Sequence, residues 1–255
     1  MTTRLINIYM TDQTKKPFQF QRPSGKIFPD YSVVISEKVM ASIKDTLDHL
    51  RLAKRWHGIS TQEDALHQIV LRFFLGHGHA PTIDELSQIS KQSIGVINML
   101  LDQLCQRDLI VLEGTGDITG AYPFTDKVSE HRITIDNVDN HAMCAIDALG
   151  AGAMANNNSH IQSSCRQCGC EITIKTDDKG RHIKTVKPTP SIVWSGVQDI
   201  DGCAADSQCT VMAFFCSDEH LSMWREKTSP KPMGHRLSMD EGLQAGRALF
   251  QPFLG

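Results

Sequence analysis

The apolar positions in the first half of the chain recur at helical spacing. Two capping boxes, in which a hydroxyl side chain is followed three residues later by Glu, predict helices over about residues 61–75 and 83–90. A third apolar repeat indicates a helix over about residues 94–104, and an apolar run, a Gly-rich turn and a return strand follow it. Three helices and a hairpin are typical of a winged helix, which we predict for residues 61–125.

In the second half the apolar period changes to two, which indicates strands. The predicted strands cover residues 131–135, 171–176, 181–186, 191–194 and 209–216. A helix is expected over about residues 141–155, capped by Asn140 or Asp139, and two more helices after Ser217 and at the capping box that begins at Ser238. This order predicts an α+β fold with a mainly antiparallel sheet.

These patterns divide the chain into three parts. Residues 1–60 form an N-terminal extension with one helical pattern and no role that the sequence assigns. Residues 61–125 form the winged-helix-like domain, and residues 126–255 form the α+β core.

Charge and hydropathy limit the partners that the chain is expected to have. The formal net charge is −3, and residues 61–125 hold three basic side chains against eight acidic ones, so we expect no binding to nucleic acid. No apolar run approaches the roughly 20 residues that span a bilayer, so no membrane association is expected. Met1 to Met10 lacks the apolar stretch of a secretion signal, which favours a cytoplasmic location.

Eight cysteines in such a chain are expected to be reactive thiols or metal ligands rather than a disulfide framework. Cys105 stands alone in an apolar helical pattern, which favours packing in the core. Cys165 and Cys168 have the spacing of half a tetrahedral zinc site, and Cys203 with Cys209 could complete it. For four cysteines the sequence leaves open whether they bind metal or form disulfides. They are Cys168, Cys170, Cys203 and Cys216.

Cys144 and Asp147 lie three residues apart within the predicted helix at 141–155, so they should share a helix face. Apolar neighbours should desolvate Asp147 and raise its pKa, which would place a proton donor beside a nucleophile. A plainer interpretation is a buried small residue beside a solvated charge. His141 could also pair with Cys144 as the base of a cysteine hydrolase.

Four stretches together resemble the organomercurial (alkylmercury) lyases, and the resemblance covers roughly residues 61–255. The stretches are Ala142-Met-Cys-Ala-Ile-Asp-Ala-Leu149, Ile161-Gln-Ser-Ser-Cys165, Cys209-Thr-Val-Met-Ala-Phe-Phe215 and Tyr122-Pro-Phe-Thr125. The resemblance implies that Cys144, Asp147 and Cys209 form the catalytic site and bind the mercury, and that Cys165 is structural. Met143 and Thr210 stand where some members have an aromatic residue and a cysteine.

The resemblance also implies a reaction. Mercury is a soft cation and thiolate is the softest ligand that a protein offers, so two cysteines suit an organomercury substrate. We expect a protonolysis of the carbon–mercury bond that requires no cofactor. Cellular thiols would remove the Hg(II), and a mercuric reductase would be the accepting partner. An alternative is a metal-responsive winged-helix binding protein with a cysteine-rich zinc or mercury site.

Overall fold

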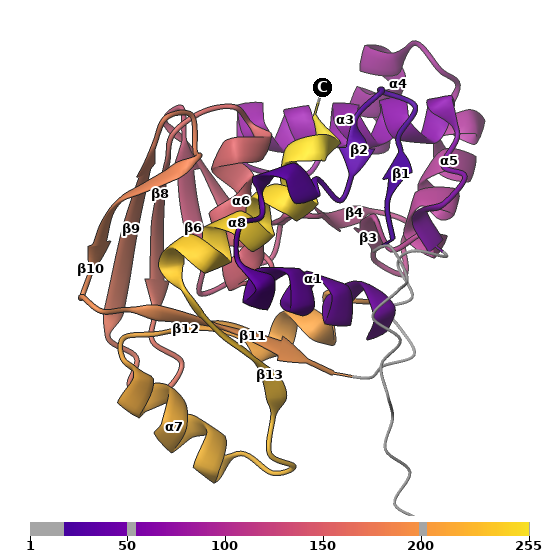
Figure 1. Ribbon diagram of the computed structural model, residues 1–255. Coiled ribbons are helices and arrows are strands. Elements are labelled where there is room, and N and C mark those ends of the chain that lie inside the picture. The colour runs from indigo at the N-terminus through magenta and orange to yellow at the C-terminus, as the bar shows by residue number, and fades with distance from the viewer. Residues whose placement is uncertain (1–17, 50–54, 199–202, 255) are drawn as a thin grey trace, which may run out of the picture.

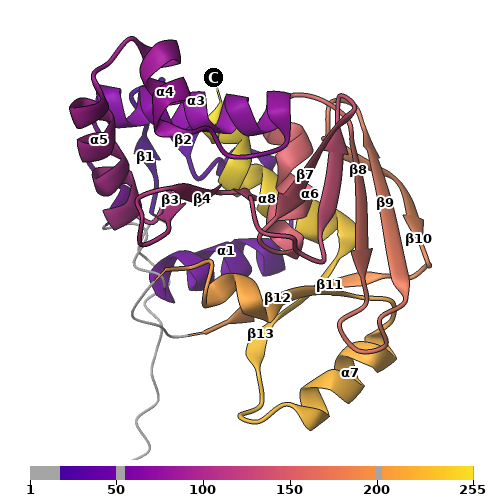
Figure 2. The ribbon, with the colours of Figure 1, turned by 180° about the vertical axis from the view of Figure 1, so that it is seen from behind.

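The computed structural model describes residues 18–49, 55–198 and 203–254 (Figure 1). Helices and strands fall largely into separate runs along the chain, and every strand pairing within these ranges is antiparallel, so the predicted α+β class is confirmed. Figures 1 and 2 show the long strands on one side of the molecule and the helices of the first half on the other, with two helices between them.

Two helices of the first half begin at the predicted capping residues. Ser60 and Thr82 each accept the backbone N–H of a Glu three residues later, which in turn caps them. The elements are α3 (Thr61–His77), α4 (Ile83–Ser90), α5 (Ile94–Gln106), β3 (Ile110–Leu112) and β4 (Ile118–Ala121). The order of three helices and a hairpin is therefore confirmed, whereas the assignment as a winged helix stays a prediction. Cys105 is exposed on α5, so the prediction that it packs in the core is wrong.

A large sheet continues from this hairpin into the second half of the chain. Its eight strands follow the order β10-β9-β8-β6-β7-β5-β4-β3. The further strands are β5 (Phe124–Thr125), β6 (Arg132–Ile135), β7 (Val138–Ala142), β8 (Ser159–Ser164), β9 (Glu171–Asp177) and β10 (His182–Lys187). Because Phe124 pairs with Ala142, hydrogen bonds of one sheet cross the boundary predicted between residues 125 and 126.

Two helices, α6 (Ala145–Met154) and α8 (Met239–Phe250), pack against each other in the middle of the molecule. Their contact is close because glycines face each other: a Cβ on Gly150 would lie 2.5 Å from the carbonyl oxygen of Gly246. All residues of α6 are buried, which matches its almost entirely apolar sequence. The helix is therefore surrounded by the core on every side.

A second sheet of three strands, in the order β12-β11-β13, lies beside α8. Its strands are β11 (Ile192–Val197), β12 (Met212–Phe215) and β13 (Met233–Ser238). The helix α7 (Asp218–Lys227) connects β12 to β13, and a 3-10 turn, η3 (Gln251–Phe253), follows α8.

The described part of the predicted N-terminal extension packs on this body. It contains β1 (Phe20–Gln21), β2 (Ile27–Phe28), the 3-10 turn η1 (Tyr31–Val33) and α1 (Glu37–His49). Phe28 is fully buried, and the Ser42 hydroxyl of α1 donates a hydrogen bond to Ser195 in β11 at 2.8 Å. The rest of the extension, residues 1–17 and 50–54, lies outside the described residues.

None of the helices in the described ranges has both the length and the apolar character needed to cross a membrane.

Candidate functional site

Cys144 lies at the junction of β7 and α6, where it is the N-cap residue of the helix. The predicted start of this helix near Asn140 is therefore wrong, since Asn140 and His141 belong to β7. Asp136 and Asn137 both have positive φ and form a tight turn that pairs β6 with β7. This pairing extends the backbone as far as Ala142, and the helix can begin only after it.

The cap geometry brings Cys144 close to Asp147, although not by the shared helix face that the spacing suggested. The backbone N–H of Asp147, in the first turn of α6, points at the Cys144 sulfur at 3.5 Å. A helix N-terminus favours a thiolate, but burial is the larger effect and raises the pKa of Cys144. The Asp147 carboxyl raises it further. Cys144 therefore carries its proton at neutral pH.

Asp147 is a buried carboxyl, with only 3% of its surface exposed. Burial raises its pKa from the usual 3.8 to about 7, as the apolar sequence around it predicted. The thiols of Cys144 and Cys209 act in the opposite direction by hydrogen bonding, and the Cys209 sulfur lies 3.7 Å from Asp147 Oδ2. The carboxyl is thus poised to gain or lose a proton near neutral pH.

Cys209 does not lie in a strand, which corrects the prediction of a regular strand over residues 209–216. It belongs to a 3-10 turn, η2 (Gln208–Val211), and β12 starts only after it. Two contacts hold the turn: the Cys209 N–H donates to the Ala204 carbonyl at 2.9 Å, and the Gln208 side chain donates to the Gly196 carbonyl. The turn directs the Cys209 side chain toward α6.

Cys144, Asp147 and Cys209 form what we call the inner cluster. One sulfur or oxygen atom of each lies within 4.8 Å of those of the others, and all three residues are buried. The structure therefore brings together the three residues that the sequence selected as a site. The neighbouring Cys144 thiol, and after it burial, raise the pKa of Cys209 well above its usual value, so this thiol is also protonated at rest.

The inner cluster borders a cavity of about 50 Å³ whose exposed lining is almost wholly apolar. Its apolar side chains outside the cluster include Trp56, Ile146, Met212, Leu249 and Phe250. Asp108 and Tyr122 also line it, and the Tyr122 hydroxyl donates to Asp108 at 3.2 Å. No sequence pattern assigns Asp108 to a site, because only the folded chain brings it to the cavity. Tyr122 belongs to one of the stretches that carry the family resemblance, which gives it no role.

His141 does not support the alternative of a cysteine hydrolase. Its ring Nδ1 accepts the backbone N–H of Ser129 at 3.3 Å. This nitrogen therefore already has a hydrogen-bond partner, which is not Cys144.

Four other side chains form a second group, which we call the outer cluster: Cys165, Cys168, Cys216 and His220. The predicted zinc set of Cys165 and Cys168 with Cys203 and Cys209 is wrong in its second half. Cys209 belongs to the inner cluster, and the Cys203 sulfur lies 3.6 Å from the Tyr122 hydroxyl. The sequence signal that we missed is the spacing of Cys216 and His220, four residues apart at the start of α7.

Comparisons with known proteins place the chain in a family. The alkylmercury lyase family model, MerB, matches residues 124–251, half of the chain. Alkylmercury lyases of Bacillus cereus and Staphylococcus epidermidis are 23% and 21% identical over 175 residues, which cover 69% of this chain and 76% and 77% of those proteins. A crystal structure of the mercury-bound form of MerB2 has a TM-score of 0.68 and 20% identity, and the match covers 86% of this chain and 100% of that one. The chain therefore belongs to the alkylmercury lyase family.

Proposed function

We propose that this protein cleaves the carbon–mercury bond of alkyl- and arylmercury compounds by protonolysis, giving the hydrocarbon and Hg(II). The observation that carries the proposal is the inner cluster itself, in which two thiols and one carboxyl meet within 4.8 Å beside an apolar cavity. Two sulfurs suit a soft metal better than imidazole or carboxylate would. The apolar lining suits the organic group of the substrate.

Binding of R–Hg⁺ replaces the thiol protons of Cys144 and Cys209 by mercury. Both thiols start protonated, since burial raises the pKa of Cys144, and the Cys144 thiol together with burial raises that of Cys209. Two protons must therefore leave as the two S–Hg bonds form. One passes to the Asp147 carboxylate, which lies 3.7 Å from the Cys209 sulfur, and the other leaves with the ligand that mercury brought into the site.

Asp147 then acts as the general acid. The two thiolates donate electron density to mercury, which makes the bonded carbon more like a carbanion. Asp147 gives its proton to this carbon, the electron pair of the C–Hg bond forms the new C–H bond, and R–H leaves. A carboxyl whose pKa is about 7 is well matched to this step, because it can take up a proton and release it at neutral pH.

Hg²⁺ remains on the two sulfurs after the hydrocarbon has left. Small cellular thiols can remove it by ligand exchange, and a mercuric reductase is the partner that we propose as its acceptor. The protonolysis transfers no net electrons, so the proposed reaction uses no redox cofactor. A cytoplasmic location would supply the reduced thiols that this release requires.

The test is a mass balance in heavy water. The purified protein is incubated with methylmercury and excess small thiol in D₂O, and methane and Hg(II) are measured by mass spectrometry. We expect one CH₃D for each methylmercury consumed, because the transferred proton comes from exchangeable groups. Ethane as the main product, or methane without deuterium, would contradict protonolysis.

A further inference from the structure

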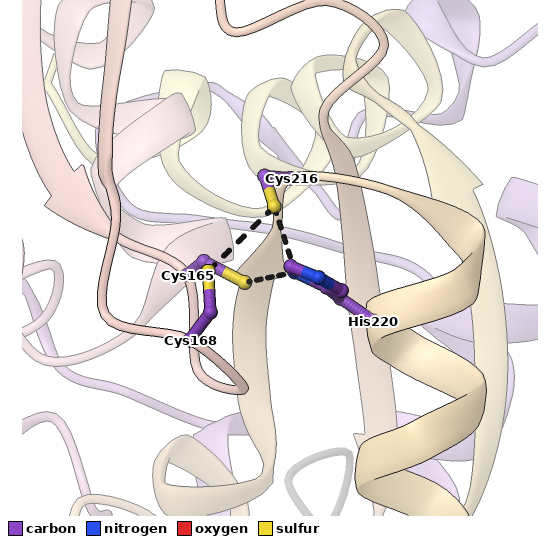
Figure 3. Close-up of side chains that lie close together, drawn as sticks. All are labelled: Cys165, Cys168, Cys216 and His220. Carbon is purple, nitrogen blue, oxygen red and sulfur yellow. Dashed lines mark hydrogen bonds between the residues drawn. The ribbon is translucent and has the colours of Figure 1, made fainter.

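The outer cluster joins two segments that are far apart in the sequence (Figure 3). Cys165 and Cys168 lie in the connection between β8 and β9. Cys216 follows β12 directly, and His220 lies in the first turns of α7. None of these four residues belongs to the inner cluster or lines its cavity.

The four donor atoms all lie within 4.8 Å of one another, close to the spacing that a metal-centred tetrahedron requires. The Cys168 and Cys216 sulfurs are 3.9 Å apart, and His220 Nδ1 lies 3.6 Å from the Cys165 sulfur and 2.9 Å from that of Cys216. Bonds of about 2.3 Å from zinc to sulfur and about 2.0 Å to nitrogen give tetrahedral edges of about 3.5 to 3.8 Å. The separations of 3.9 Å and 3.6 Å lie within about 0.2 Å of these edges. The separation of 2.9 Å is about 0.6 Å too short, so the Cys216 and His220 side chains must move apart as the metal enters.

The first segment has the backbone of a metal-binding turn. The Gly169 N–H donates to the Cys165 carbonyl at 2.8 Å, and the Cys165 N–H donates to the Cys170 carbonyl at 2.8 Å. Gly169 has a φ of +72°, a conformation that glycine adopts without strain.

The donor set indicates which metal fits. Two cysteines separated by two residues, with a cysteine and a histidine separated by three, have the ligand spacing of structural zinc sites. A sulfur separation of 3.9 Å is far from the roughly 2.05 Å of a disulfide bond. Three sulfurs and one nitrogen in a tetrahedron are typical of Zn²⁺, whereas Ca²⁺ and Mg²⁺ prefer oxygen.

We propose that Cys165, Cys168, Cys216 and His220 bind one structural Zn²⁺, which ties the β8–β9 connection to the end of β12. Four protein ligands complete the coordination, so the site leaves no open position for a substrate. The metal is thus distinct in place and in role from the mercury of the proposed reaction.

This site would also support the inner cluster, because β12 follows the turn that carries Cys209. Arg166, between the first two ligands, holds the same segment: its N–H donates to the Phe214 carbonyl at 3.0 Å and its guanidinium to the Thr210 carbonyl at 2.9 Å. Zinc at the end of β12 would fix the segment beyond these contacts. The outer cluster would then hold the Cys209 turn in place without touching the substrate.

The test is the metal content of the full chain, produced with zinc in the medium and without mercury. Elemental mass spectrometry should find about one zinc per chain. Cys168→Ser and His220→Ala should each lower this below about one-tenth. Cys170→Ser changes a thiol in the same loop outside the ligand set, and Cys105→Ser changes an exposed thiol on α5, so both should retain the zinc.

Cobalt provides a readout that does not depend on how the protein was produced. Folded protein from which the metal has been stripped should bind Co²⁺ with the visible bands of a tetrahedral ion and with sulfur-to-cobalt charge-transfer bands. Circular dichroism verifies that each variant is folded. His220→Ala should lose these bands while its fold persists.

Three results would overturn the proposal. They are a folded parent protein with neither zinc nor tetrahedral cobalt bands, zinc lost in Cys144→Ser but kept in Cys168→Ser, and a site that takes up Hg(II) but no zinc. Because these measurements involve no organomercury turnover, a protein that holds zinc but releases no methane would contradict the proposed function alone.

Discussion

The inner and outer clusters each contain a cysteine from the same short segment, Cys209 and Cys216, but the two cysteines have different neighbours. In the inner cluster, burial raises the pKa of Cys144, the Cys144 thiol and burial raise that of Cys209, and a carboxyl lies beside both. In the outer cluster, an imidazole takes the place of the carboxyl. Burial there raises the pKa of Cys165, but backbone N–H groups outweigh it and the net pKa is lowered.

The pKa of Cys168 is also lowered, chiefly by the backbone N–H of Cys170. That of Cys216 is raised, first by burial and then by the neighbouring thiols, a repulsion that a bound cation would remove. Protonated thiols beside an acid suit a metal that arrives, reacts and leaves. Three sulfurs and an imidazole, with no acid among them, suit a metal that stays. The surroundings, more than the cysteines, separate the two roles.

The largest effect should come from removing one sulfur of the inner cluster. Cys209→Ser leaves a single thiol for mercury, and a hydroxyl is a poor ligand for a soft metal, so methane release should fall to background. Zinc content should remain at the parent level. Gas chromatography and elemental analysis of the same sample measure both. Methane at the parent rate would remove Cys209 from the mechanism, and loss of zinc would merge the two clusters into one site.

Asp147→Asn should separate binding from proton transfer. The amide is close in size to the carboxyl but cannot deliver a proton, so kcat should fall by about 10² to 10⁴. Both thiols remain, and the variant should still bind one methylmercury, measured by elemental analysis after gel filtration. Cys105→Ser, a change on the exposed face of α5, is the control for handling. A variant with unchanged kcat would show that another group is the acid.

The same carboxyl should also impose a pH dependence on stability. Its pKa is about 7 in the folded chain against an ordinary value of 3.8, so the folded form holds the proton more tightly than the unfolded chain. This favours folding at low pH and is lost as pH rises from about 4 to about 7. A shift of this size corresponds to about 4 kcal/mol of unfolding free energy.

Urea unfolding at about pH 4.5 and about pH 8 measures this dependence, and Asp147→Asn is the matched control. Other titrating groups act in both proteins, so the difference between them isolates Asp147. The parent should lose more stability between the two pH values than the variant does. Parallel pH profiles would indicate that the Asp147 pKa is not raised.

The sequence predicts those features of the fold and of the inner cluster that depend on residues close together in the chain. The capping boxes at Ser60 and Thr82 marked the helix starts because cap and partner are three residues apart. The apolar neighbours of Asp147 predicted its raised pKa for the same reason, since they lie on its own helix. The choice of Cys209 as its partner came from the resemblance, because no local pattern links them.

The predictions that were wrong or missing concern contacts between distant parts of the chain, with the exception of the start of α6. The turn at Cys209 is held by Ala204 and by the Gly196 carbonyl, and an apolar period of two cannot reveal either contact. His220 meets Cys165 only because β12 lies near the end of β8. The Asp136-Asn137 turn was a local signal, and it would have corrected the start of α6.

The smallest predicted effect concerns the link between the two clusters. Arg166 pairs with Glu130 and donates to the Thr210 carbonyl, so Arg166→Ala should free the turn that carries Cys209. We expect a few-fold lower kcat, unchanged zinc and a loss of about 1 kcal/mol in stability. Arg132→Ala, which breaks the exposed ion pair between Arg132 in β6 and Asp139 in β7, is the matched control and should leave kcat unchanged. Equal kcat values for both variants would mean that the outer loop does not position Cys209 through Arg166, and that the two clusters act independently at this contact.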